Sequence, residues 1–103
     1  MNYQTANAML TGRCKDRRKI GNNTYLIRRG KEIAIRLHQT DIITLNDANE
    51  IIVNTGGWHT VTTKARLNDY LPIGIYQKKG EWYWQHGDKF RDGDKITLEG
   101  RIK

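Results

Sequence analysis

Three side chains near the middle of the chain have the types that acid–base chemistry needs. His38, Asp41 and His59 supply two imidazoles and a carboxylate, with the hydroxyl of Thr40 beside them. An imidazole next to a carboxylate can act as an acid–base pair or bind a metal near neutral pH. The alternative is structural: Asp41 caps a turn and His38 bonds to it, and no HExxH or Gly-x-Ser-x-Gly motif accompanies them. The set is a weak catalytic candidate, and the sequence favours a protein that is not an enzyme and has no cofactor or metal.

A second candidate is an anion site at the start of an expected helix. A glycine pair there precedes several hydroxyls and a lysine. Thr62, Thr63 and Lys64 fall in the first turns, where free N–H groups and the helix dipole attract a phosphate, and Arg66 adds charge. The first glycine and the Gly-Lys-Ser/Thr ending of a Walker A loop are missing. The alternative is that the threonines only cap the helix and that Trp58 fills the core.

A third candidate is an aromatic strand near the C-terminal end. Alternation places Trp82 and Trp84 on one face, and the neighbouring strand supplies Tyr76, Lys78 and Lys79. If exposed, the tryptophan face would stack nucleic-acid bases or anchor a partner protein. If buried, it is core, which a chain with one Phe needs. We expect at least one ring to be buried.

Positive charge is concentrated in one segment of this basic protein. Between Thr11 and Lys31 a single acid, Asp16, accompanies eight basic residues, so the segment carries the whole formal net charge of +7. The eight are Arg13, Lys15, Arg17, Arg18, Lys19, Arg28, Arg29 and Lys31. A local positive field attracts polyanions such as nucleic acid. The alternative is a solvated basic tail without a partner.

The chain as a whole has the size and composition of one folded domain. It has 103 residues, of which 37% are hydrophobic and 28% charged, and a chain of this length seldom contains two cores. Its apolar runs are far shorter than the roughly 20 residues of a membrane-spanning helix. Cys14 is the single cysteine, which excludes an internal disulfide and a multi-thiolate zinc site. The first residues lack the order of a secretory signal, so we expect a cytoplasmic protein.

The pattern of elements predicts an α+β fold behind a flexible arm. Residues 1–22 lack alternation or helical period and read as a basic arm, whereas residues 23–103 read as a single domain. Within it Ile33, Ile35 and Leu37 define the core face of one strand. Strands are expected over Thr24–Arg28, Glu32–His38, Asp41–Leu45, Glu50–Asn54, Ile73–Lys79, Glu81–His86 and Lys95–Ile102, with one helix over Thr60–Leu71. We therefore expect an antiparallel curled sheet or small barrel of six to seven strands with one helix.

An ordered series of short segments covers about half of the chain. The segments are Gly21–Tyr25, Arg28-Arg29, Ile33–His38, Thr40–Thr44, Asn54–Trp58, Thr62–Asn68 and Leu71-Pro72. The series resembles a widespread family of short proteins from tailed phages and mobile elements. The residues from Gln85 to Lys103 depart from the family pattern. The resemblance implies a phage-like origin, hence a host bacterial cytoplasm, and small phage accessory proteins commonly bind nucleic acid or disable a host defence.

The leading functional prediction is a small phage-type accessory protein that binds nucleic acid or a host nucleoprotein complex, in an anti-CRISPR-like or other anti-defence role. Its contact residues would be Arg13, Lys15, Arg17, Arg18, Lys19, Arg28, Arg29, Lys64, Arg66, Lys78, Lys79, Trp82 and Trp84. One alternative is a protein–protein inhibitor that uses the aromatic strand. Another is a nucleotide-binding protein or phosphodiesterase centred on His38, Asp41 and the Thr62–Lys64 helix start.

Overall fold

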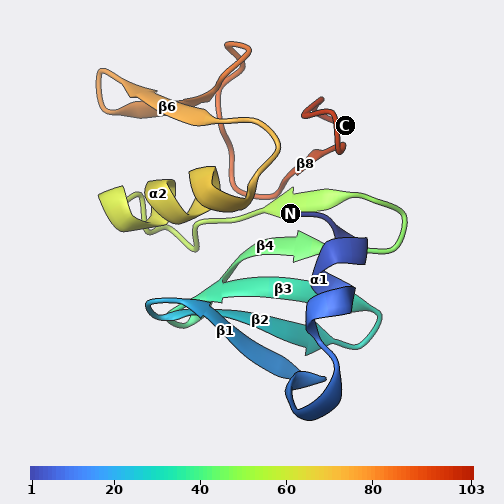
Figure 1. Ribbon diagram of the computed structural model, residues 1–103. Helices are drawn as coiled ribbons and strands as arrows, with labels where there is room; N and C mark the ends of the chain where they lie inside the picture. Colours follow the sequence, from blue (N-terminus) through green and yellow to red (C-terminus); the bar gives the residue numbers. More distant parts are fainter.

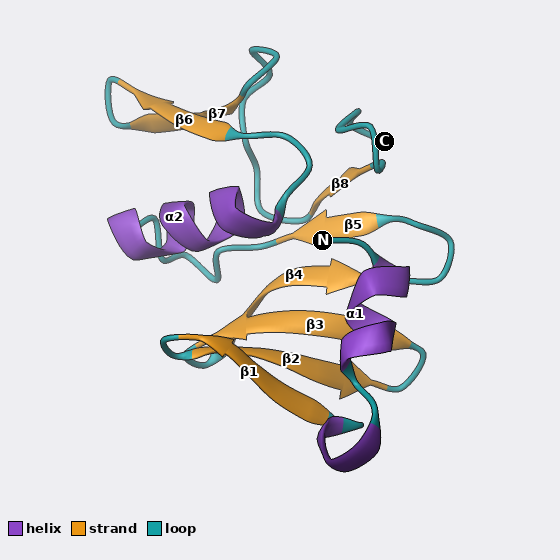
Figure 2. Ribbon diagram, viewed as in Figure 1, coloured by secondary structure: helices purple, strands orange, loops and turns teal.

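An antiparallel six-stranded sheet, a separate two-stranded hairpin and two α-helices make up the fold (Figures 1 and 2). The computed structural model describes residues 1–103. The helices are α1 (Tyr3–Met9) and α2 (Val61–Tyr70), with a short 3-10 turn, η1 (Gly12–Cys14), between α1 and the first strand. The strands are β1 (Arg17–Gly21), β2 (Thr24–Arg29), β3 (Glu32–Leu37), β4 (Thr40–Leu45), β5 (Ile51–Val53), β6 (Ile75–Lys78), β7 (Glu81–Trp84) and β8 (Asp94–Ile96).

The main sheet has the strand order β1-β2-β3-β4-β5-β8. The first five strands follow one another as antiparallel neighbours, and β8 returns to pair with β5 after α2 and the β6–β7 hairpin. The α+β class and the antiparallel sheet are confirmed. The sheet stays open, because β1 and β8 are its two edges and do not pair. The structure has eight strands and two helices, whereas the sequence predicted six to seven strands and one helix.

The predicted core face of β3 is confirmed. Ile33 and Ile35 are fully buried and Leu37 nearly so, and Ile35 pairs with Leu26 of β2 and Ile43 of β4. A β-bulge between β3 and β4 also buries Ile42. The same apolar cluster includes side chains of α1 and α2, so we call the side of the sheet that it occupies the core face and the opposite side the outer face.

The N-terminal segment contains regular structure where the sequence predicted none. Ala6 and Leu10 are buried in the core cluster, and Asn2 caps α1 by accepting a hydrogen bond from the Thr5 amide at 2.8 Å. Arg18 Nη1 donates to the Met9 carbonyl at 3.2 Å. Two buried side chains are too few to give a visible helical period, so residues 1–22 resembled an arm although they cover the core.

The single helix predicted over residues 60–71 is α2. Thr60 is its N-cap, and its hydroxyl accepts a hydrogen bond from the Thr63 amide at 3.1 Å. The helix ends before Pro72, with Leu71 in an extended conformation. Leu67 is its fully buried contact with the core. No helix in the structure combines the length and hydrophobicity of a transmembrane span.

The β6–β7 hairpin lies apart from the main sheet and contributes side chains to the core (Figure 1). Trp82 is 6% exposed and Trp84 is completely buried. Both rings pack against Phe90, at 5.8 and 5.4 Å between centroids, and Trp84 Nε1 donates to Asp94 Oδ2 at 2.9 Å. The two tryptophans therefore do not form the open aromatic face that the sequence analysis considered, and the expectation that at least one ring is buried is confirmed.

Candidate nucleic-acid interface and a neighbouring pocket

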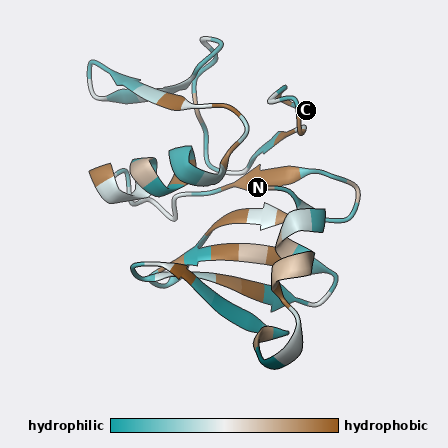
Figure 3. Cartoon of the chain, in the orientation of Figure 1, coloured by the Kyte–Doolittle hydropathy of each residue, from teal (hydrophilic) through white to brown (hydrophobic).

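The outer face of the sheet gathers basic and aromatic side chains from four strands. Strand register aligns Lys19, Tyr25, Arg36 and Asp41 in one row across β1 to β4. A second row runs Arg17, Ile27, Ala34, Thr44, Ile52 and Lys95 across β1 to β5 and β8. In Figure 3, β1 is hydrophilic whereas β2 to β5 carry apolar residues. The second row thus has Arg17 and Lys95 at its two ends, with Ile27, Ala34 and Ile52 among the residues between them, and Ile27 and Ala34 are buried.

Two arginines of this face have different partners. The Arg17 guanidinium carbon lies 4.2 Å from the centroid of the Tyr25 ring, within the range of a cation–π contact. Arg29 donates through Nε and Nη2 to the two carboxylate oxygens of Asp41, each at 3.2 Å. Arg17 remains exposed and keeps its donors for a ligand, whereas Arg29 is already paired with an acid.

Arg36 is the unusual side chain of the outer face. Its Nε atom is buried and has no hydrogen-bond partner. Asp41 is its register neighbour on β4, but that carboxylate is bonded to Arg29. An unpaired buried donor costs free energy, so its presence calls for an explanation such as a missing acceptor. Because the Nε atom itself is buried, an anionic ligand could approach this guanidinium only through its terminal nitrogens.

The basic segment predicted as one cluster is divided between the two faces. Arg28 lies on the core-face side, where its Nε donates to the Lys15 carbonyl at 3.2 Å and its Nη2 to Asn7 Oδ1 at 2.9 Å. Arg18 bonds to α1 as described, so both arginines hold the N-terminal segment on the sheet. Arg13 and Lys15 are exposed around η1. The sequence analysis could not separate these roles, because each depends on which face of the sheet the side chain occupies.

The predicted catalytic set is not assembled. His38 is exposed in the β3–β4 turn with a left-handed φ of 55°, while Asp41 faces Arg29 on the outer face. His59 packs edge-on against Trp82, with 4.9 Å between ring centroids. No three His, Cys, Asp or Glu side chains come together as a metal site would require. The three residues therefore belong to three different environments.

The predicted anion site at the start of α2 is largely occupied by contacts within the chain. Thr63 is buried and its hydroxyl accepts from Thr60 at 3.0 Å, while Thr62 stays exposed. Lys64 donates to Gln77 Oε1 of β6 at 3.1 Å. Arg66 donates to Thr24 Oγ1 at 3.2 Å, and its Nη1 lies 3.4 Å from an oxygen of Asp69. The two cations thus link α2 to neighbouring elements.

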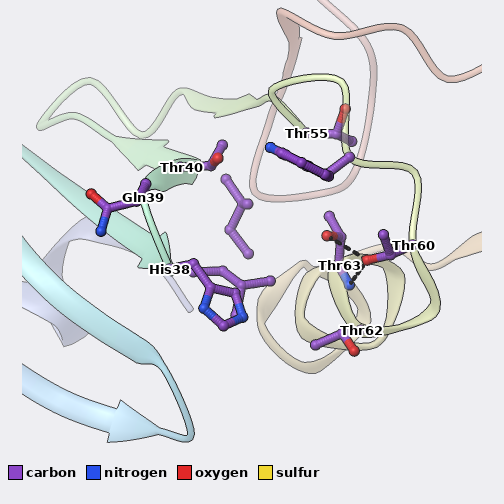
Figure 4. A pocket seen from close by; sticks show the side chains of 10 residues that line it. His38, Gln39, Thr40, Thr55, Thr60, Thr62 and Thr63 are labelled. Carbon is purple, nitrogen blue, oxygen red and sulfur yellow. Dashed lines mark hydrogen bonds between the residues drawn. The ribbon is translucent and has the colours of Figure 1, made fainter.

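A pocket of about 450 Å³ lies between the β3–β4 turn and the start of α2 (Figure 4). Leu37 and Ile42 line it together with threonines from β4, the loop between β5 and α2, and α2 itself. Trp58, which the sequence analysis offered as a core residue, borders the pocket and is 65% exposed. Thr62, Thr63 and His38 thus meet at a cavity that the sequence did not predict, because it forms between elements distant in the chain.

The remaining predicted basic residues lie on the tip of the hairpin. Lys78 and Lys79 are exposed there, and Tyr76 stacks on Tyr83 with 5.6 Å between centroids. The phenol of Tyr83 donates to Glu81 at 3.0 Å. This hydrogen bond, followed by the hydrogen bond and the charge of Lys89, lowers the pKa of the Glu81 carboxyl, and the same bond to Glu81 raises the pKa of Tyr83. This surface is a second, smaller basic region, separate from the outer face.

Comparison with known proteins identifies the family of the chain. The family model described as Kyanoviridae Gp96 protein matches residues 1–97. No curated protein and no solved structure matches the chain significantly. The matched range includes both faces of the sheet, the pocket and most of the C-terminal residues that departed from the expected phage pattern. The chain belongs to the Kyanoviridae Gp96 family of phage proteins.

Proposed function

We propose that the chain is a phage accessory protein that binds nucleic acid through the outer face of its sheet. The observation that carries this proposal is the Arg17–Tyr25–Arg36 arrangement, in which the Arg17 guanidinium covers the Tyr25 ring and Arg36 is the register neighbour of Tyr25 on the next strand. Phosphates would lie against Arg17, Lys19 and Arg36, since phosphate contacts supply most of the sequence-independent affinity for nucleic acid.

The residue types of this surface favour a nucleic-acid strand over a protein partner. Single-strand binders combine a cationic surface with aromatic rings on which bases stack. Tyr25 is half-buried next to the exposed Arg17 and Lys19. The alternative of a protein inhibitor depended on an exposed tryptophan strand, and both tryptophans are buried. In the host cell the same face would fit the nucleic acid of a nucleoprotein defence complex, which is the anti-defence form of this proposal.

Binding of fluorescent single-stranded DNA and RNA oligonucleotides, followed by anisotropy at low salt, tests the proposal. The double variant Arg17→Gln/Lys19→Gln removes two charges from the outer face. The charge-matched control, Arg91→Gln/Arg101→Gln, changes two exposed arginines elsewhere. We expect weaker binding for the first variant and nearly unchanged binding for the control. Equal losses for both variants would show that net charge alone, and not this face, governs binding.

A further inference from the structure

The pocket between the β3–β4 turn and α2 is built for a neutral ligand. None of its ten lining residues is Asp, Glu, Lys or Arg. Its side chains therefore offer no permanently charged group to a phosphate or a carboxylate, and the N-terminus of α2 is the one fixed source of positive potential beside it. Its volume of about 450 Å³ lies within the range of small-ligand pockets, which combine an apolar lining with a few polar groups. Leu37 and Ile42 supply the apolar part.

Trp58 stands at the edge of this pocket on a well-fixed loop. The Trp58 amide donates to the Thr55 carbonyl at 3.1 Å, and the Thr55 hydroxyl is bonded to both oxygens of Asp92 at 2.9 Å. Gly56 has a φ of 64°, and a Cβ there would lie 2.9 Å from Thr40 Cγ2, so the loop packs directly on β4. A large aromatic ring that is exposed on an anchored loop is suited to stacking against a flat ligand.

The polar groups around the pocket divide into those already bonded and those still available. The hydroxyls of Thr60 and Thr63 bond to each other, and that of Thr55 bonds to Asp92. The side chains of His38, Gln39, Thr40 and Thr62 complete the polar lining (Figure 4). Hydroxyl, amide and imidazole groups can both donate and accept hydrogen bonds. Together they match the mixed donor and acceptor edge of a nucleobase.

We propose that this pocket binds one unpaired nucleobase, stacked on Trp58 and held at its edge by the hydroxyl, amide and imidazole groups of the pocket. The inference rests on the proposed function, because it makes the ligand a single strand with one base turned into the pocket. Arg36 of the cationic row and Leu37 of the pocket are consecutive residues on opposite faces of β3, so a strand that contacts both would pass around the β3–β4 turn. A base that is already unpaired enters such a pocket at little unstacking cost.

Free nucleosides test the pocket without the phosphate contacts. Trp82 and Trp84 are buried, so quenching of tryptophan fluorescence by an added ligand reports mainly on Trp58. We expect at least one of adenosine, guanosine, cytidine and uridine to quench with saturation, and Thr62→Val to weaken that saturation. Val61→Ala, a change at an exposed neighbour outside the pocket lining, leaves it unchanged. Saturation by glucose but by no nucleoside would overturn the proposal in favour of a sugar site.

An abasic oligomer separates failure of the pocket from failure of the proposed function. We expect Trp58→Ala to weaken binding of a single-stranded oligonucleotide about 5- to 100-fold, the range expected for loss of one stacked base. Binding of an abasic phosphodiester oligomer of equal length stays unchanged, because only phosphates are contacted. Equal affinity of the two oligomers for the wild type would overturn the base pocket while leaving phosphate binding in place. Absence of binding to both oligomers would overturn the proposed function, and the nucleoside measurement would then decide the pocket by itself.

Discussion

Ile35 and Arg36 are neighbours in sequence and lie on opposite faces of β3. Ile35 is fully buried in the core cluster, whereas Arg36 belongs to the cationic row of the outer face. We expect Ile35→Ala to lower the free energy of unfolding by about 2–5 kcal/mol, because it leaves a cavity in the core. Arg36→Ala should change it by less than about 1 kcal/mol and weaken oligonucleotide binding instead. Urea denaturation of both variants, with anisotropy for binding, makes the comparison. A larger loss of stability in Arg36→Ala would reverse the assignment of the two faces.

At the residue scale, the environment of a side chain could be predicted only where a local sequence pattern determines it. Alternation identified Ile33, Ile35 and Leu37 as core residues, and an N-cap preference identified Thr60. The partner of Asp41 could not be predicted, because Arg29 reaches it across an intervening strand. Such pairings depend on sheet twist and on the β-bulge, and neither feature leaves a signal in the sequence.

The N-terminal helix is the element whose role differs most from expectation. Leu10 is 3% exposed and packs in the same cluster as the central strands. We expect Leu10→Ala to reduce the free energy of unfolding by about 2–4 kcal/mol, as for other large-to-small changes in a core. Chemical denaturation monitored by circular dichroism measures the loss. Ala8→Gly, an exposed position in the same helix, is the control and should cost only about 1 kcal/mol. Unchanged stability of Leu10→Ala would restore the arm that the sequence suggested.

The β6–β7 hairpin should respond to acid through Glu81. Hydrogen bonds from Tyr83 and Lys89 lower the pKa of this carboxyl below its ordinary value. A carboxyl with a lowered folded-state pKa stabilises the fold above the unfolded value, and that contribution disappears as pH falls through the folded-state pKa. We expect Tm to fall below about pH 4.5 and Glu81→Gln to remove part of the fall. Thermal melts across this pH range measure it. Glu99→Gln changes an exposed carboxylate outside the hairpin, so we expect its dependence of Tm on pH to match that of the wild type. An identical effect of both changes would contradict the assignment of the acid response to Glu81.

Element prediction succeeded for hairpins and failed for contacts distant in sequence. The three predicted hairpins all form, because each depends on alternation and a nearby turn. The addition of β8 to β5 brings together segments separated by α2 and a hairpin, which no local pattern specifies. The same reason applies to the pocket, since Leu37, Thr55 and Thr62 come from three elements. The candidate site thus depends on how the elements pack against one another, which the sequence patterns of the single elements do not specify.

At the scale of the whole molecule, the sheet divides four arginines and lysines of the basic segment into two pairs, Arg18 with Arg28 and Arg17 with Lys19. The first pair stabilises the N-terminal segment and the second lies on the outer face. Each phosphate contact to a single strand contributes about −0.7 to the slope of log affinity against log salt. We expect Arg17→Gln/Lys19→Gln to make that slope shallower by about 1.4, measured by anisotropy between low and moderate salt. An unchanged slope would show that neither residue contacts a phosphate.

The separation of the β6–β7 hairpin from the main sheet has a consequence for amide hydrogen exchange. The hairpin shares no strand pairing with the six-stranded sheet and is attached by packing of Trp82, Trp84 and Ile75 and by side-chain hydrogen bonds to α2 and β8. Side-chain packing without a shared ladder allows one unit to open while the other keeps its hydrogen bonds. Amides of β6 and β7 will therefore exchange through a local opening, whereas those of β3, paired on both sides, exchange only when the whole sheet unfolds. We therefore expect the backbone amides to fall into two classes of protection from hydrogen exchange. The pocket lies next to the main sheet, whose amides are the better protected.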